Sequence, residues 1–151
     1  MKTQNFILLL FVIFLNNGCE KDEETSSTNL SLPIDVFIEG YVQKGPFLEG
    51  STVIVTELDD ELNPTQTTHT VNIDNDLGHY NLTATVDSRC LEFSITGSYF
   101  NEISGEVSES EITLSALVET DYDINANVNV LTSISKKRIL FLMRRKGLSF
   151  F

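Results

Sequence analysis

Oxygen-bearing side chains recur at alternate positions at Asp121, Asp123 and Asn125. Carboxylate and amide oxygens at this spacing are typical of loops that bind calcium. An EF-hand loop would next require glycine at its sixth position and glutamate at its twelfth, where this chain has Ala126 and Thr132. The sequence therefore argues against an EF-hand and leaves only a weaker, irregular calcium site.

Such an irregular site would combine Asp121 and Asp123 with a carboxylate from elsewhere in the chain, for which Asp74 or Asp76 is the candidate. Extracellular modules bind calcium weakly, so an incomplete ligand set is compatible with this chemistry. The alternative is that these four residues are solvated turn acids, because Asp is favoured in turns. The residue types alone leave both interpretations open.

Other combinations of reactive side chains are incomplete. His69 and His79 flank a turn, but no third His and no neighbouring Cys completes a zinc site. Ser133 and Lys136 fit the Ser-x-x-Lys pattern of penicillin-recognising enzymes, whose Ser-Asp-Asn and Lys-Thr-Gly elements this sequence lacks. The sequence also contains no nucleophile elbow and no glycine-rich phosphate loop. We therefore expect a non-enzymatic protein with no catalytic residue and no cofactor.

Residues 1–18 have the composition of an export leader. Lys2 supplies a positive start, and residues 6–15 are ten consecutive apolar residues. A membrane-spanning helix needs about 20 such residues, so this stretch matches the core of a signal peptide. Gly18 provides a small residue directly before Cys19, whose thiol could carry a diacylglyceryl group.

The pattern around Cys19 resembles the signal peptides of bacterial lipoproteins, with Asn16 and Asn17 where those usually have Leu and a small residue. The resemblance implies cleavage before Cys19 and a mature chain held to a membrane by acyl chains. An ordinary secretory signal with an incidental cysteine is the alternative. If Cys19 is lipidated, Cys90 has no disulfide partner, and a free cysteine on a strand usually behaves as a small buried hydrophobe.

Residues 20–33 are first acidic and then small and polar. Such a segment cannot bury enough apolar surface to fold, so we expect a flexible tether that ends at Pro33. The cluster at residues 21–24, a lysine followed by acids, resembles the export signal that sends some Gram-negative lipoproteins to the cell surface. The expected location is the outer membrane, at the cell surface or on the periplasmic face.

The charges of the chain are unevenly distributed. The whole chain has 10 basic and 22 acidic residues, yet Lys44 and Arg89 alone oppose eighteen acids between Ile34 and Ser135. Six basic residues and no acid follow from Lys136 to the end. Because a body this acidic repels phosphate backbones, we do not expect nucleic acid to be its partner.

Apolar residues alternate with polar ones from Ile34 to about Val118. A period of two predicts β-strands that each bury one face. Turn residues separate these runs, and about seven short strands of this kind predict an antiparallel β-sandwich. The clearest stripes are Val36-Ile38-Gly40-Val42, Tyr80-Leu82-Ala84-Val86, Leu91-Phe93-Ile95 and Ile112-Leu114-Ala116-Val118.

The pattern changes near Asn127, and a helix is predicted in the tail. Asn127 or Asn129 could cap this helix, and its basic last turn suits the negative end of the helix dipole. The predicted packing stripe consists of Val128, Leu131, Ser135, Ile139 and Leu142.

The apolar run at residues 139–143 leaves apolar surface on the other side of the helix as well. This predicts that more protein normally covers the helix, as if the sequence were part of a longer chain. Contact with anionic lipid is the alternative. It is the weaker of the two, because a tethered domain already has an anchor.

Several short motifs follow one another along residues 40–150. They are 40–47, Gly50-Ser51, 57–59, 62–64, 76–78, 99–105 and 127–132. They resemble a poorly characterised group of bacterial lipoproteins that often have further helical sequence downstream. The first half also resembles the carboxypeptidase regulatory-like (transthyretin-like) β-sandwich, which implies a hairpin at residues 74–80. Such sandwich modules are usually non-catalytic, and the resemblance transfers no activity.

The sequence thus predicts a leader (1–18), a lipidated tether (19–33), a transthyretin-like or immunoglobulin-like sandwich (34–124) and a helical segment (125–151). The expected function is display or binding by a lipid-anchored envelope protein, through exposed loops and sheet edges. The expected partners are the membrane and an extracellular protein or glycan. The alternative function is an accessory module of a larger secreted enzyme whose catalytic part lies beyond Phe151.

Overall fold

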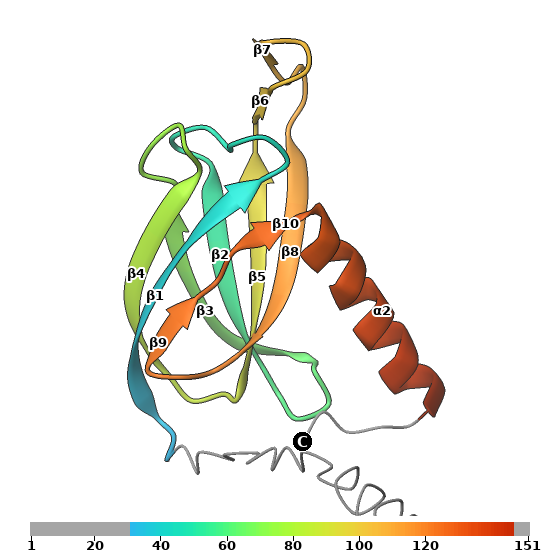
Figure 1. The fold of residues 1–151 in the computed structure, drawn as a ribbon. Coiled ribbons are helices and arrows are strands. Elements are labelled where there is room, and N and C mark those ends of the chain that lie inside the picture. The colour runs from blue at the N-terminus through green and yellow to red at the C-terminus, as the bar shows by residue number, and fades with distance from the viewer. Residues whose placement is uncertain (1–30, 147–151) are drawn as a thin grey trace, which may run out of the picture.

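The computed structural model describes residues 31–146, which form two packed β-sheets with a helix on one side (Figure 1). The first sheet contains, in order, β10 (Val128–Asn129), β1 (Ile34–Gln43) and β4 (His79–Val86), with β9 (Asp123–Asn125) also paired to β1. The second sheet contains β3 (Pro64–Asn72), β2 (Thr52–Leu58), β5 (Cys90–Gly97) and β8 (Ile112–Glu119). A projecting hairpin of β6 (Phe100–Asn101) and β7 (Glu106–Val107), and the helix α2 (Val130–Lys146), complete the described part. The predicted mainly-β sandwich followed by a C-terminal helix is confirmed.

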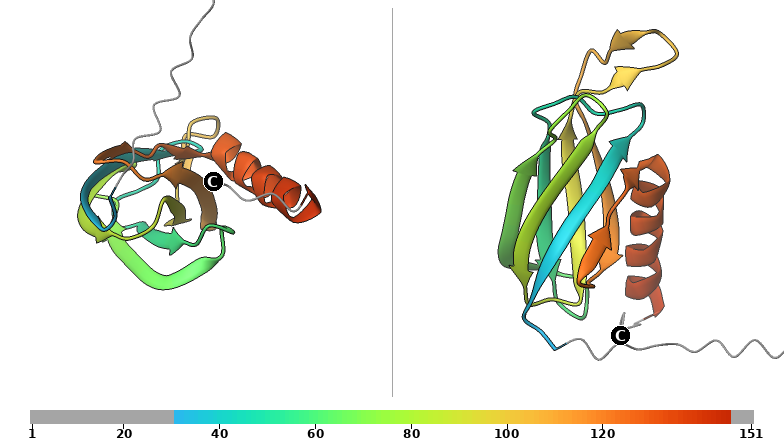
Figure 2. Two further views of the ribbon diagram at one scale, coloured as in Figure 1. Left: turned by 90° about the horizontal axis from the view of Figure 1, so that it is seen from below. Right: turned by 60° about the vertical axis from the view of Figure 1, so that its left-hand side comes forward.

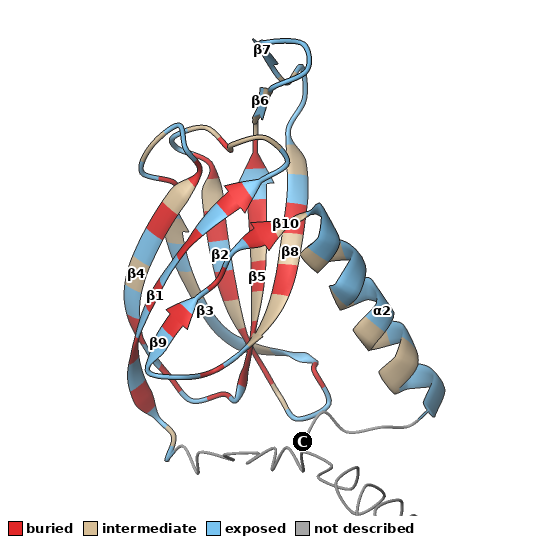
Figure 3. Ribbon diagram, viewed as in Figure 1, coloured by how far each residue is buried: buried red, intermediate tan, exposed pale blue. Residues whose placement is uncertain are grey.

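The core lies between the two sheets, where alternate residues of each strand meet (Figure 3). In β1, buried and exposed positions alternate over all ten residues. Each large aliphatic or aromatic side chain buried in this way contributes about 1.5–3 kcal/mol to folding. The predicted stripes are confirmed by their buried members, which include Val36, Ile38, Val42, Tyr80, Val86, Leu91, Phe93, Ile95, Leu114 and Ala116.

The last strands differ from the predicted antiparallel arrangement. After β8 the chain crosses to the first sheet, where β9 and β10 both run parallel to β1. Ile124, Ala126 and Val128 are buried in the core of the sandwich, and α2 begins only at Val130. Both strands are too short to carry a clear local pattern, so their contacts with β1 decide where they lie.

Gly40 permits the chain between β9 and β10 to approach β1 closely. A Cβ atom at this position would lie only 2.2 Å from the carbonyl oxygen of Ala126. The same oxygen accepts a hydrogen bond from the Tyr80 hydroxyl at 2.5 Å, and the Ala126 N–H donates to the Glu39 carbonyl at 2.8 Å. Burial raises the pKa of Tyr80, so its hydroxyl keeps the proton that it donates. These contacts hold the crossing segment against β1.

The helix α2 lies on the outer face of the second sheet, beside β8 (Figure 2). Its sheet-facing residues are Thr132, Ser133, Lys136, Ile139, Leu140 and Met143. The predicted stripe is partly wrong, because Leu131 and Ser135 are exposed. Apolar residues occur on both faces of this helix, so periodicity alone could not identify the face that contacts the sheet.

The turn at residues 74–78 joins β3 and β4, which belong to different sheets. The hairpin implied by the family resemblance is therefore not formed. One backbone hydrogen bond, from the Asp74 N–H to the His79 carbonyl at 2.9 Å, closes the turn. On the β3 side of the turn, the backbone of Ile73 forms hydrogen bonds with the residues directly before β2. On the β4 side, the Gly78 carbonyl accepts a hydrogen bond from β1. The two sides of the turn are thus held by opposite sheets.

Candidate functional site

A groove with a volume of about 600 Å³ lies where β1, β10 and the first turn of α2 meet. We call it the β1–α2 groove. Its principal lining residues are Tyr41, Gln43, Lys44, Glu102, Asn127, Asn129, Val130 and Leu131. Ligand sites typically combine an apolar contact surface with a few polar groups that orient the ligand. This mixture makes the groove the candidate functional site.

The outward face of β1 supplies one wall of the groove. Tyr41 and Gln43 face outward because the alternation that buries Val42 turns its neighbours toward solvent. Asn127 forms the opposite side, where its Oδ1 accepts a hydrogen bond from the Tyr41 N–H at 3.0 Å. Its Nδ2 donates to Oδ1 of Asn125 at 2.8 Å. β1 pairs first with β9 and then with β10. In the gap between these two pairings, the Asn127 side chain takes the place of a backbone partner for Tyr41.

The start of α2 supplies the second wall. Oδ1 of Asn129 accepts hydrogen bonds from the N–H groups of Leu131 and Thr132, at 2.8 and 3.1 Å. The predicted asparagine cap is therefore confirmed for Asn129, whereas Asn127 serves β1. Val130 and Leu131 follow directly, with 41% and 73% of their surface exposed beside the groove.

Lys44 and Glu102 bring opposite charges to the groove from the loops above β1. Nζ of Lys44 donates to the Tyr99 hydroxyl at 2.7 Å and lies 4.5 Å from the centre of the Tyr99 ring. Within residues 31–146, the side chains of Gln43 and Glu102 make no hydrogen bond or ion pair. The described lining residues include no His, Cys or Ser. The groove therefore presents exposed polar side chains, Gln43 and Glu102, that have no partner in the described part of the chain.

The four calcium candidates are divided between two places. Asp121 and Asp123 lie beside the first half of β1, whereas Asp74 and Asp76 lie in the turn next to its last residues. Within the described part of the chain, no three His, Cys, Asp or Glu side chains are grouped in a way that could hold a metal ion. The structure thus does not bring the two pairs together.

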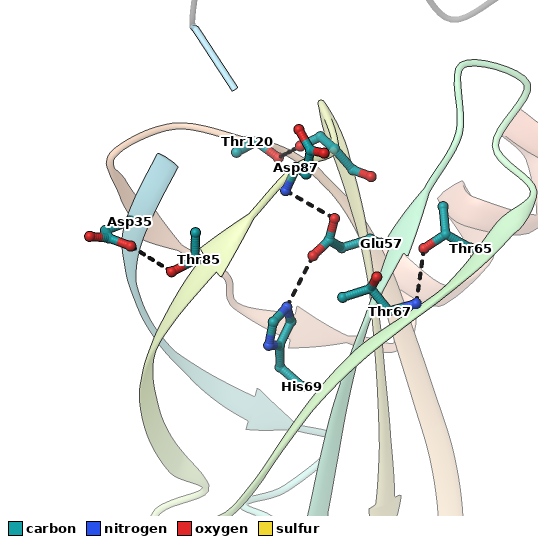
Figure 4. A network of polar contacts seen from close by, with 9 residues as sticks. Asp35, Glu57, Thr65, Thr67, His69, Thr85, Asp87 and Thr120 are labelled. Atoms are coloured by element: carbon teal, nitrogen blue, oxygen red, sulfur yellow. Dashed lines mark hydrogen bonds and ion pairs between the residues drawn. The ribbon is translucent and has the colours of Figure 1, made fainter. Parts of the chain in front are cut away.

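The two histidines contact carboxylates and each supports the local fold. Nδ1 of His79 lies 2.8 Å from Oδ2 of Asp74, within the turn between β3 and β4. Nε2 of His69 lies 3.1 Å from Oε1 of Glu57, and Oε2 of Glu57 accepts a hydrogen bond from the Asp87 N–H at 3.0 Å (Figure 4). Because Glu57 is only 3% exposed, these partners offset the cost of burying its carboxylate.

Ser133 and Lys136 attach α2 to the second sheet. Oγ of Ser133 accepts a hydrogen bond from the Ser115 N–H at 2.8 Å, and Lys136 forms an ion pair with Glu92 of β5. Their Ser-x-x-Lys spacing therefore places both side chains on the sheet-facing side of the helix. This packing role accounts for the motif without any catalytic chemistry.

Cys90 is fully buried and packs with Leu58 and Leu62 beneath the last turns of α2. Burial raises the pKa of its thiol to about 11, and the negative charge of Glu119 adds to this effect. The thiol is therefore neutral at physiological pH, as predicted for a small buried hydrophobe. The predicted lipidation site, Cys19, lies outside the described residues.

Sequence reasoning missed the β1–α2 groove. Tyr41 and Gln43 occupy ordinary outward positions of a strand, and Glu102 and Asn127 lie far from them in the sequence. Tyr41 is a large aromatic residue on the polar face of its strand, but Phe37 has the same character and does not line the groove, so this signal could not locate the site. The parallel pairing of β10 with β1 brings Asn127 beside Tyr41 and Gln43. Glu102 comes to the groove because the segment before it is held against the loop after β1, where the Phe100 N–H donates to the Pro46 carbonyl at 2.8 Å.

Among residues 31–146, no helix combines the length and the apolar composition that crossing a membrane requires. Comparisons with protein-family models, with curated proteins and with solved structures find no match for this chain.

Proposed function

We propose that this protein is a lipid-anchored envelope protein of the outer membrane whose β-sandwich is a non-catalytic binding module. Cys19 carries the acyl chains, and residues 20–33 connect it to the sandwich. The β1–α2 groove is the contact surface for an extracellular glycan or peptide.

The observation that carries the anchor is the order of features at the start of the chain. An apolar stretch too short to span a membrane is followed by Gly18 and Cys19, and then by an acidic, polar segment. The first strand begins at Ile34, directly after this segment. Such an order suits a folded module held at a distance from a membrane surface.

Metabolic labelling with a palmitate analogue tests the anchor. We expect label on the wild-type protein and none on the Cys19→Ala variant. Cys90→Ala is the matched control, because Cys90 is buried in the fold and should leave labelling unchanged. Equal labelling of the wild type and Cys19→Ala would contradict the proposal.

The groove supports a binding function because it exposes an aromatic ring beside polar groups that have no partner in the described part of the chain. Tyr41 is 46% exposed, and aromatic faces of this kind contact sugar rings and peptide side chains well. The neighbouring amide of Gln43 and carboxylate of Glu102 can hydrogen-bond to hydroxyl or amide groups.

A glycan array and a displayed peptide library provide defined ligands for testing the groove. The affinity of any ligand found should fall roughly tenfold or more in Tyr41→Ala, in line with the loss of one anchoring aromatic residue. Phe37→Ala is the matched control, because Phe37 is 43% exposed on the same face of β1 but does not line the groove. A ligand that binds both variants and the wild type equally would place the contact surface elsewhere.

A further inference from the structure

The solvent-facing side of α2 carries an unusual combination of side chains. Ile134, Arg138, Phe141 and Arg145 recur at intervals of four, three and four residues, which places them on one line along the helix. We call this line the outer stripe. Ile134 and Phe141 are each 58% exposed. The stripe lies opposite the residues that contact the sheet, so the sandwich covers none of it.

The surroundings of the outer stripe are strongly basic. Lys137, Arg144 and Lys146 are also exposed, and α2 contains no Asp or Glu. The rest of the described chain is acidic, so positive charge is concentrated on this one helix. An acidic surface would be attracted to the exposed side of the helix and repelled by the body behind it.

The alternation of apolar and cationic residues along the stripe suits an anionic lipid surface. At a bilayer interface, aromatic and aliphatic side chains enter the acyl boundary while Arg and Lys reach the phosphate groups. The guanidinium of Arg145 lies 6.0 Å from the centre of the Phe141 ring, so charge and apolar surface are adjacent. A nucleic acid would use the charges of the stripe but not its apolar residues.

We propose that the outer stripe docks α2 onto an anionic lipid bilayer. The helix has 17 residues, which corresponds to a contact length of about 25 Å. The sandwich stands behind the helix, so its acidic residues are held away from the surface. Docking rests on the proposed function only because the lipid anchor supplies the nearby membrane; the contact itself needs no acyl chain.

The position of the chain entry is compatible with simultaneous anchoring and docking. The chain enters β1 at the end of the sandwich where α2 also ends (Figure 1). There Ile34 pairs with Val86, and the last turns of α2 pack on Leu58 and Cys90 at the same end. Residues 20–33, if fully extended, span at most roughly 45–50 Å, which is ample for both contacts to share one surface.

Vesicle flotation tests docking separately from anchoring. The full chain carrying Cys19→Ser has no acylation site, so binding must come from the protein itself. We expect it to float with vesicles of phosphatidylcholine and phosphatidylglycerol more than with phosphatidylcholine alone, and less as salt rises. Replacing two arginines in Arg138→Gln/Arg145→Gln should weaken binding to the anionic vesicles roughly 10–30-fold, since each cation near an anionic surface contributes about 1 kcal/mol.

A matched control separates the stripe from total charge. Gln66→Glu/Asn72→Asp makes the same change in net charge on exposed positions of β3 and should leave binding nearly unchanged. Phe141→Ser tests the apolar part and should weaken binding roughly tenfold without changing the unfolding midpoint. Residues 1–18 are present in every variant, so the contribution of the stripe is measured as a difference between variants at a lipid concentration where flotation of the unsubstituted stripe is half-maximal.

Three results would overturn the proposal. One is equal flotation with neutral and anionic vesicles. Another is equal binding of the arginine variant and its control. The third is no flotation at all, which is the result expected if the natural partner of the stripe is another protein and not a lipid. Loss of palmitate labelling in Cys19→Ala is independent of these outcomes, so failure of docking and failure of anchoring are distinguishable.

Discussion

The sandwich and the helix are held together by different kinds of contact. Inside the sandwich, large side chains from both sheets are fully excluded from solvent, including Phe93, Tyr80 and Ile38. In α2 no residue is fully buried (Figure 3). Its attachment combines hydrogen bonds and an ion pair near its start with a small apolar cluster near its end.

This difference predicts two levels of stability in one chain. Hydrophobic burial scales with the area removed from water, so the sandwich carries most of the folding free energy. An element with few buried contacts opens locally at lower cost than the whole protein unfolds. We therefore expect α2 to detach while the sandwich remains folded, and the following variants test this separation.

The largest expected effect is in the core of the sandwich. Phe93→Ala should reduce the free energy of unfolding by about 3–5 kcal/mol, because it leaves a cavity beside the ring of Tyr80, 6.3 Å away. Urea unfolding followed by fluorescence measures the loss. Phe37→Ala is the control, since Phe37 lies on the outward face of β1, and it should cost less than about 1 kcal/mol. Equal losses would contradict the assignment of the core.

A smaller effect is expected where the chain crosses from one sheet to the other. Gly40→Ala places a methyl group within 2.2 Å of the Ala126 carbonyl oxygen and should cost about 1–3 kcal/mol. The Ala126 N–H, bonded to Glu39, should then exchange its hydrogen faster. Amides between β2 and β5 provide the internal reference. Unchanged exchange at Ala126 would show that the close approach is absent in solution.

A third variant acts on the helix alone. Asn129→Ala removes the cap of α2 and should cost about 1 kcal/mol, which corresponds to roughly fivefold faster exchange of the first helical amides. The sandwich amides should keep their protection. Asn72→Ala, an exposed asparagine at the end of β3, serves as the control. If unfolding of the sandwich shifts equally in Asn129→Ala, the two regions are one cooperative unit.

The last prediction concerns the reactivity of Cys90 and involves no change of stability at neutral pH. With Cys19→Ser in place, iodoacetamide at pH 8 should modify Cys90 roughly 100-fold more slowly in folded than in urea-unfolded protein, because the folded pKa is about 11. The pKa of Cys90 is higher in the folded than in the unfolded protein, so its contribution to folding stability is present in full at pH values below the unfolded pKa of about 9. This contribution is lost as the pH rises toward 11.

Cys90 also reports on the helix, since it lies beneath the last turns of α2. Asn129→Ala should accelerate its modification if detachment exposes the thiol. Rapid modification of the otherwise native protein would contradict the burial of Cys90.

Much of the sandwich could be predicted because its pattern is local. In β1, β4, β5 and β8 the alternation of side chains requires only an extended backbone, whatever partner the strand finds. The asparagine cap was predictable for the same reason, because Asn129 bonds to residues two and three positions later. The hairpin expected at residues 74–80 is not formed, because sheet pairing on either side of the turn outweighs the turn itself.

The candidate site could not be predicted from the same patterns. The bond between the Tyr41 N–H and Asn127 joins residues 86 positions apart, and no local periodicity records such a contact. The face of α2 that contacts the sheet was equally hidden, because both faces contain apolar residues.

The sequence by itself determined which side chains turn inward along each long strand, since the pleat of an extended chain imposes that alternation. It also determined the acidic body, the basic helix and an asparagine cap at Asn127 or Asn129, between which the structure selects Asn129. Only the tertiary structure decided that β9 and β10 run parallel to β1, and thereby formed the β1–α2 groove. The reason is physical: two short strands have little structural preference of their own, and they acquire a position only when a longer strand and a neighbouring glycine provide one.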